Sequence, residues 1–185
     1  MTVSSHPQVS RFETEAMPHI NDLFRTAARM LGDRSRAEDV VQETYLQAWK
    51  SFHKFQPGTN CRAWLFKILF HCAHHRRRKD LRFPVATASS EVLEAAAAGP
   101  PPVPDALTDA EILAAVDKIP ADFRPVVLLV DVEEFAYKEV AEILAIPIGT
   151  VMSRLSRGRK LLRRYLAEAA EAYGIRGDIE KGQGA

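Results

Sequence analysis

The chain has 185 residues, of which 46% are hydrophobic, and its 25 Lys and Arg nearly balance its 24 Asp and Glu. This composition excludes a disordered chain and fits a globular protein of one ordinary domain or two small ones. The sequence has no run of about 18 apolar residues, and its N-terminus lacks an apolar centre, so we expect a cytoplasmic protein without membrane insertion.

The first part of the chain predicts an amphipathic helix. Apolar side chains recur at helical spacing across residues 12–31, and Gly32 follows the last of them. Pro18 fits the opening turn of a helix, where its missing N–H is not needed, so the regular part is expected to begin near Met17. Residues 1 to about 10 are polar and are expected to be loose.

A second helix is expected to follow, capped by Asp33 or Ser35. Its apolar side chains, Trp49 and Phe52 among them, are predicted to point inward, which leaves a polar and locally acidic face. Such a face either meets only water or binds a protein, because its carboxylates would repel DNA. The residues of this acidic face are Glu38, Asp39, Gln42 and Glu43.

The next segment combines a loop with a basic helix. Residues 53–60 contain Pro57 and Gly58 and are predicted to form a loop, whose Phe55 offers a ring to an unstacked base. Residues 61–80 interleave aromatic and basic side chains, which is what single-stranded nucleic acid binds. The candidate contacts are Phe55, Asn60, Arg62, Trp64, Lys67 and His71.

Cysteine and histidine gather in the same helix, at Cys61, His71, Cys72, His74 and His75. A zinc site is disfavoured, because structural zinc sites draw ligands from both ends of a loop and neighbouring residues on one helix cannot converge tetrahedrally. Two cysteines are also too few for a disulfide framework, so we expect thiols. We therefore expect no bound metal, and no role is assigned to the histidine cluster.

Composition changes in the middle of the chain. Residues 80–107 are rich in Ala, Ser, Gly and Pro and cannot build a core, so they are predicted to form a flexible linker between domains at 11–79 and 108–172. After it, the β-branched residues 126–130 fit either a helix or a short strand. We favour a helix, because the sequence offers no partner strand.

Residues 135–164 are typical of two short helices joined by a turn. Pro147 cannot continue the first helix, and Thr150 can cap the second. From Met152 to Leu166 the chain has six Lys or Arg and no acid, which favours a helix-turn-helix with its second helix in the major groove. The same basic pattern also fits an amphipathic helix whose basic face only meets water, or one that serves a protein partner or a membrane surface. The predicted base-reading stripe is Thr150, Ser153, Arg154 and Arg157, with Arg159 and Lys160 nearer phosphates.

These motifs together resemble bacterial sigma factors of the extracytoplasmic-function group, the smallest class of RNA polymerase specificity subunits. RAEDVVQETYLQAW is similar to the family's polymerase-binding helix, RAWLFKI resembles its promoter-melting segment, and EVAEILAIPIGTVMSRLSRGRKLL resembles its minus-35 reader. Ala145 stands where the family often has glycine. The resemblance, which covers most of residues 11–172, implies an all-α fold of two small helical domains, the second a four-helix domain with the helix-turn-helix.

The resemblance also implies the partners, namely core RNA polymerase, promoter DNA and an anti-sigma factor. The acidic face would bind polymerase, and the loop with the basic helix would capture the minus-10 strand. The first alternative is a helix-turn-helix regulator that binds duplex DNA without polymerase. The second is a helical adaptor that binds only protein, which would leave thirteen Lys or Arg within 62–82 and 154–164 without a purpose. No phosphate loop or nucleophile motif occurs, so we expect neither an enzyme nor a cofactor.

Overall fold

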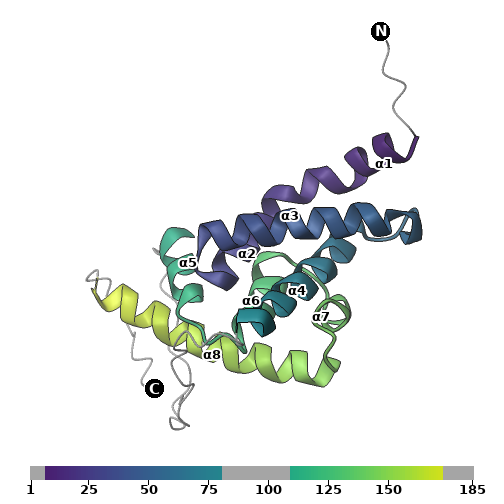
Figure 1. Cartoon of the computed structure of the whole chain (residues 1–185). Helices are drawn as coiled ribbons and strands as arrows, with labels where there is room; N and C mark the ends of the chain where they lie inside the picture. The colour runs from purple at the N-terminus through teal and green to yellow at the C-terminus, as the bar shows by residue number, and fades with distance from the viewer. Residues whose placement is uncertain (1–6, 81–108, 173–185) are drawn as a thin grey trace, which may run out of the picture.

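The computed structural model describes residues 7–80 and 109–172, and every regular element within these ranges is a helix (Figure 1). The predicted all-α class is confirmed. None of these helices has the length and apolar character needed to span a bilayer. Apart from Asp80, the predicted linker lies outside the described residues. The helices are α1 (Pro7–Ala16), α2 (Ile20–Leu31), α3 (Arg34–Ser51), α4 (Cys61–Asp80), α5 (Asp109–Asp117), α6 (Arg124–Val127), α7 (Tyr137–Leu144) and α8 (Ile148–Ala172).

The first helical segment differs from its prediction. Helix α1 already begins at Pro7, and a 3₁₀ turn at Met17–His19 separates it from α2. Pro18 lies inside that turn and not at the start of a long helix. Because proline has no N–H to donate to the carbonyl four residues back, the α-helical hydrogen bonding stops there and restarts at Ile20.

The junction of α2 and α3 follows its sequence signals. Gly32 ends α2 in the left-handed conformation, with a φ of 65° and its N–H bonded to the Ala28 carbonyl. Asp33 caps α3, because its carboxylate accepts from the Arg36 N–H at 2.9 Å. Of the two predicted caps, Asp33 is therefore the one used.

Aromatic rings tie α1, α3 and the following loop together. Phe12 meets Phe52 edge to face, with ring centroids 5.0 Å apart, and Phe52 stacks on Phe55 at 5.7 Å. Phe12 also meets Trp49 at 5.2 Å, but Trp49 stays 39% exposed, so its predicted inward position is wrong in part. Each ring pair adds about 0.5–1.5 kcal/mol beyond the burial of its area, so the cluster holds the loop 53–60 against the helices.

The β-branched segment after Arg124 is helical, as we favoured. Residues 126–129 are fully buried, and α6 passes into a π-helical turn at Leu128–Val132. The Glu133 N–H donates to the Leu128 carbonyl at 2.9 Å, which closes this wide turn. Glu134 follows with a left-handed φ of 57°. This change of direction sets Glu133 and Phe135 against the N-terminal half.

Helices α7 and α8 form the predicted helix-turn-helix. Helix α7 ends at Ala145, whose φ of 52° lies in the left-handed region that favours glycine. Thr150 does not cap α8, which corrects the prediction. The helix already begins at Ile148, and the Thr150 N–H donates to the Pro147 carbonyl at 2.9 Å. Thr150 therefore lies within the first turn.

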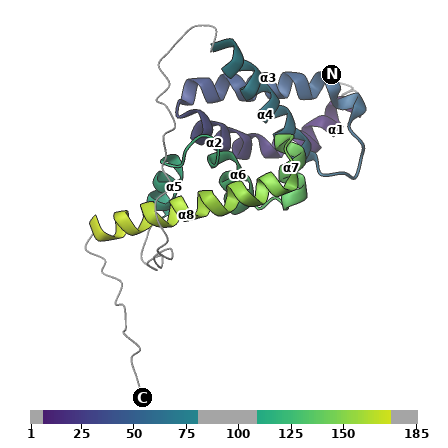
Figure 2. The same cartoon turned by 90° about the horizontal axis from the view of Figure 1, so that it is seen from below.

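The two halves of the chain pack against each other (Figures 1 and 2). Helix α4 lies against α7, and Phe66 of α4 meets Phe135 edge to face with ring centroids 5.0 Å apart. At the far end of α2, Arg29 pairs with Asp117 at 3.3 Å, and Arg124 donates to the Arg29 carbonyl at 2.9 Å. Apolar and polar contacts thus join the halves.

Gly158 marks the closest approach of α8 to α6. A methyl group there would lie 2.5 Å from Cγ2 of the fully buried Val127. We expect Gly158→Ala to lower the free energy of unfolding by about 1–3 kcal/mol through overpacking, reduced by the roughly 1 kcal/mol that alanine gains in helix propensity. Urea denaturation measures the difference. Gly149→Ala is the matched control, since no atom of the described residues outside its own stretch of helix lies within 4 Å of its added methyl. Equal losses at both sites would contradict the crowding.

Candidate nucleic-acid interface

The predicted base-reading stripe lies on one face of α8. Thr150, Ser153, Arg154 and Arg157 are spaced by three or four residues, and Ser153 and Arg157 are exposed. The Ser153 hydroxyl donates to the Thr150 carbonyl at 3.1 Å. Neither Arg154 nor Arg157 forms an ion pair with any other described residue. Their guanidinium groups are therefore available to a ligand, and exposed Lys160 lies two turns beyond Ser153 on the same side.

Arg159 follows Thr150 by nine residues in α8. Because each residue of an α-helix turns by about 100°, nine residues place the two side chains on opposite sides of the helix. It pairs with Asp131 through contacts of 2.5, 3.1 and 3.2 Å. Hydrogen bonding to Asp131 raises the pKa of Arg159 against the opposing effect of burial. The predicted phosphate contact of Arg159 stays a prediction, and in this structure the Asp131 carboxylate holds its guanidinium.

Asn60 caps α4 and also reaches the C-terminal half. Its side-chain oxygen accepts from the Ala63 N–H at 3.0 Å, while its amide nitrogen donates to Oε1 of Glu139 at 2.7 Å. The other Glu139 oxygen accepts from the Ala136 N–H at 3.0 Å, at the start of α7. Asn60 thus links the first turns of α4 and α7.

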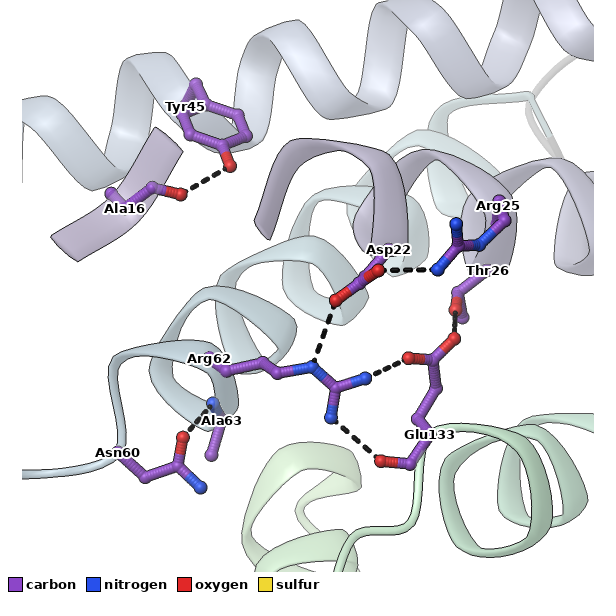
Figure 3. Close-up of polar contacts among 9 residues, drawn as sticks. All are labelled: Ala16, Asp22, Arg25, Thr26, Tyr45, Asn60, Arg62, Ala63 and Glu133. Carbon is purple, nitrogen blue, oxygen red and sulfur yellow. Dashed lines mark hydrogen bonds and ion pairs between the residues drawn. The ribbon is translucent and has the colours of Figure 1, made fainter. Parts of the chain in front are cut away.

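Arg62 lies at the centre of a polar junction between the halves (Figure 3). Its Nε donates to Asp22 at 3.3 Å, its Nη1 donates to the Glu133 carbonyl at 2.8 Å, and its Nη2 pairs with the Glu133 carboxylate. The remaining carboxylate oxygen of Glu133 accepts from the Thr26 hydroxyl at 2.7 Å. We call these four residues, Asp22, Thr26, Arg62 and Glu133, the polar junction.

The other predicted minus-10 residues differ in accessibility. Phe55 is only 6% exposed and its ring lies 5.0 Å from that of Trp64, so the prediction of a ring free to stack on a base is wrong for this structure. The loop 53–60 packs against the helices because burying the Phe55 ring removes apolar area from water. Trp64 is half-buried, whereas Lys67 and His71 are exposed on α4. Lys67 and His71 therefore remain available to a ligand.

The acidic face of α3 is exposed at all four of its residues, Glu38, Asp39, Gln42 and Glu43. Glu38 and Gln42 border a shallow groove between α2 and α3 that Phe24 and Val41 also line. Asp39 instead points toward α4, where it pairs with Arg76 at 2.9 Å. Because this pair is exposed, it contributes little to stability, about 0–1 kcal/mol. The acidic face can therefore accept a partner without unfolding the helix.

The two cysteines are unpaired thiols. Burial raises the pKa of Cys61 to about 11, with Glu15 acting in the same direction and Arg11 against it. Burial also raises the pKa of Cys72. Both thiols are thus protonated at neutral pH in the metal-free chain, which makes them weak nucleophiles. In the described part of the chain, no group of three or more His, Cys, Asp or Glu residues is placed to hold a metal ion.

Sequence reasoning missed the carboxylates that meet the start of α4. Glu139 carries a local signal, because it stands three residues after Ala136, the spacing of a helix-capping acid. Glu133 carries none, since the residues that it contacts, Thr26 and Arg62, lie 107 and 71 positions away. Only the packing of the two halves reveals that contact.

Comparison with known proteins identifies the fold. Residues 16–83 match the family model of Sigma-70 region 2, and residues 109–162 match that of Sigma-70, region 4. The chain is 35% identical over 153 residues to the ECF RNA polymerase sigma factor SigE of Mycolicibacterium smegmatis, covering 81% of this chain and 59% of the relative. It is 33% identical over 172 residues to the ECF RNA polymerase sigma factor EcfG of Rhodopseudomonas palustris, covering 91% and 92%.

A solved structure agrees with these relatives. The sigma factor RpoE from Bartonella quintana, crystallised in complex with the anti-sigma factor NepR, matches with a TM-score of 0.64 and 30% identity, over 86% of this chain and 98% of that one. The chain carries Sigma-70 regions 2 and 4 in this order and its described elements are all helices, which places it among sigma factors of the Sigma-70 type. The chain belongs to the ECF RNA polymerase sigma factors, the family that the sequence resemblance indicated.

Proposed function

We propose that this sigma factor divides promoter recognition among three surfaces. The acidic face of α3 binds core RNA polymerase, the start of α4 binds the minus-10 strand, and the Thr150 to Arg157 stripe of α8 reads minus-35 bases. One observation carries the proposal: α3 exposes carboxylates, whereas α8 presents the exposed Arg157 and the half-buried Arg154, neither of which forms an ion pair with another described residue. Only the basic helix suits a phosphate backbone, so the acidic helix is left for a protein partner.

For the minus-10 strand, the proposed contacts combine cations with one aromatic face. Lys67 and Arg62 would meet phosphates, and the half-buried Trp64 would stack on an unstacked base. Asn60 and His71 would add hydrogen bonds. Phe55 is left out of the set, because its ring belongs to the aromatic core.

The proposal includes the domain division expected from the sequence, with 11–79 and 108–172 as the polymerase and minus-35 domains and 80–107 as their linker. We place the protein in the cytoplasm, where transcription occurs. It supplies binding and strand capture, and the polymerase performs the chemistry.

The Bartonella quintana relative was crystallised with an anti-sigma factor, and this supports a similar inhibitor here. A regulator that acts without polymerase is disfavoured by the family to which the chain belongs.

The test is reconstitution with core RNA polymerase, followed by transcription from a promoter that core alone cannot use. In the same assay we expect Asp39→Lys to weaken core binding about tenfold, because it places a like charge against the surface that the acidic face complements. Asp39 is exposed, so the melting temperature is expected to change by no more than about 2 °C.

Glu13→Lys on α1 provides the matched control, because Glu13 is also exposed and undergoes the same charge change. It should leave core binding nearly unchanged. Equal losses for the two variants would mean that core binding responds only to net charge. Unfolding of Asp39→Lys would show that this residue supports the helix and not the interface.

A further inference from the structure

Glu133 is a buried carboxylate that the C-terminal half inserts into the N-terminal half. The residue is only 7% exposed, although isolated carboxylates are rarely buried. Figure 3 shows it between the α2 side chains and Arg62 of α4. Both of its carboxylate oxygens are used, one by the Thr26 hydroxyl and one by the Arg62 guanidinium. A buried charge needs such partners, so this contact forms only when the two halves close on each other.

Arg62 has no nitrogen left without an intramolecular acceptor. Nε faces Asp22, Nη1 faces the Glu133 carbonyl, and Nη2 faces the Glu133 carboxylate. The guanidinium carbon also lies 4.6 Å from the ring centroid of Phe135, which comes from the C-terminal half. In this closed arrangement three of the five N–H donors of Arg62 are used inside the chain, and its charge already faces two carboxylates, which compete with a phosphate.

A second minus-10 candidate is occupied in the same way. Asn60 donates to Glu139 of α7 at 2.7 Å, and Glu139 also caps α7. Two carboxylates of the C-terminal half thus meet the two polar residues at the start of α4. A carboxylate offers the same anionic oxygens to a guanidinium as a phosphate does.

We propose that Glu133 is an intramolecular competitor of the promoter strand for Arg62, so that the free chain closes on its own minus-10 site. The proposal rests on the proposed role of Arg62 in strand binding. Closure and binding of the strand therefore compete, because the Arg62 donors that hold Glu133 cannot serve a phosphate at the same time. The apparent affinity for single-stranded DNA is then the intrinsic affinity reduced by the open fraction.

The test uses the full chain with Glu133→Gln, which removes the charge and keeps the shape of the side chain. Glu134→Gln is the matched control, since Glu134 is exposed, adjacent and of equal charge. The distance between the halves is followed by single-molecule fluorescence transfer from cysteines introduced at exposed Lys50 and Glu142. Binding is measured with a random-sequence single-stranded DNA of about 12 nucleotides, a length within the site sizes of single-strand binders.

We expect Glu133→Gln to raise the open fraction and to tighten DNA binding about threefold to tenfold, in proportion to that fraction. Glu134→Gln should change neither quantity. Thr26→Val removes the hydroxyl that donates to Glu133, so it should also raise the open fraction and tighten DNA binding. This second variant tests the proposal if Glu133→Gln does not fold.

Three outcomes separate the ideas. Opening together with tighter binding supports the competition. If the chain stays closed in both Glu133→Gln and Thr26→Val, the competition is wrong. The proposed function is not affected by that result, because transcription by the holoenzyme tests it separately. Opening without any gain in DNA binding overturns the competition and the assignment of Arg62 to the strand together.

Discussion

Phe66→Ala is expected to lower the free energy of unfolding by about 3–5 kcal/mol, the usual cost of removing a fully buried phenylalanine. Phe66 is 0% exposed, and its ring meets Phe135 from the other half at 5.0 Å. The substitution therefore leaves a cavity in the N-terminal core and also removes an aromatic contact between the halves. Guanidinium denaturation followed by tryptophan fluorescence measures the loss, since both tryptophans, Trp49 and Trp64, lie in the N-terminal half.

Lys67→Ala, at the next residue of the same helix, is the control. Lys67 is exposed, so its removal should change the free energy of unfolding by no more than about 0.5 kcal/mol. A loss below about 1 kcal/mol for Phe66→Ala would contradict the packing described for α4.

Arg157→Ala is expected to change promoter preference more than overall promoter affinity. Arg157 is exposed on the same face of α8 as Ser153 and has no ion-pair partner among the described residues. Losing one guanidinium from a base edge should cost about 1–3 kcal/mol on the preferred base, which is roughly 5- to 150-fold, and should relax selectivity at one position. Transcription by reconstituted holoenzyme across a library of minus-35 variants, at fixed salt, gives the measurement.

Arg164→Ala provides the comparison, because Arg164 is exposed two turns further along α8 and its guanidinium lies 5.2 Å from the Tyr165 ring. A phosphate contact there would weaken all promoters by a similar factor. If Arg157→Ala also lowers every promoter equally, α8 is only an electrostatic anchor and the base-reading role is wrong.

The periodicity of apolar residues was enough to predict most of the helices, because each amphipathic helix buries a face that local spacing defines. The helix-turn-helix and the choice of helix over strand at residues 126–130 followed from such local rules. The exposure of a candidate site could be predicted where its residues belong to one helix, because helical spacing alone then defines the face. All four residues of the acidic face of α3 are exposed, and in the α8 stripe Ser153 and Arg157 are exposed while Thr150 and Arg154 are half-buried.

Other features depend on contacts that no local pattern contains. Pro18 suits either a first turn or a break, and only the packing of Phe12 shows that a separate helix precedes it. Phe55 is buried because Phe52 and Trp64 come to it from neighbouring segments. Arg159 was grouped with DNA-facing cations because charge alone does not reveal a carboxylate 28 positions away. Glu133 is the extreme case, since both of its partners lie in the other half.

The charged character of the contacts between the halves makes ionic strength a second variable in promoter binding. Arg29 pairs with Asp117 between the halves in a partly exposed position, where dissolved ions weaken the attraction between the two charges. Added salt therefore favours the open chain, while the same ions weaken each contact to DNA phosphate. Because the two effects oppose each other, binding by the free chain should depend on salt less steeply than its phosphate contacts alone imply. In a chain whose halves are held open, the full dependence should return.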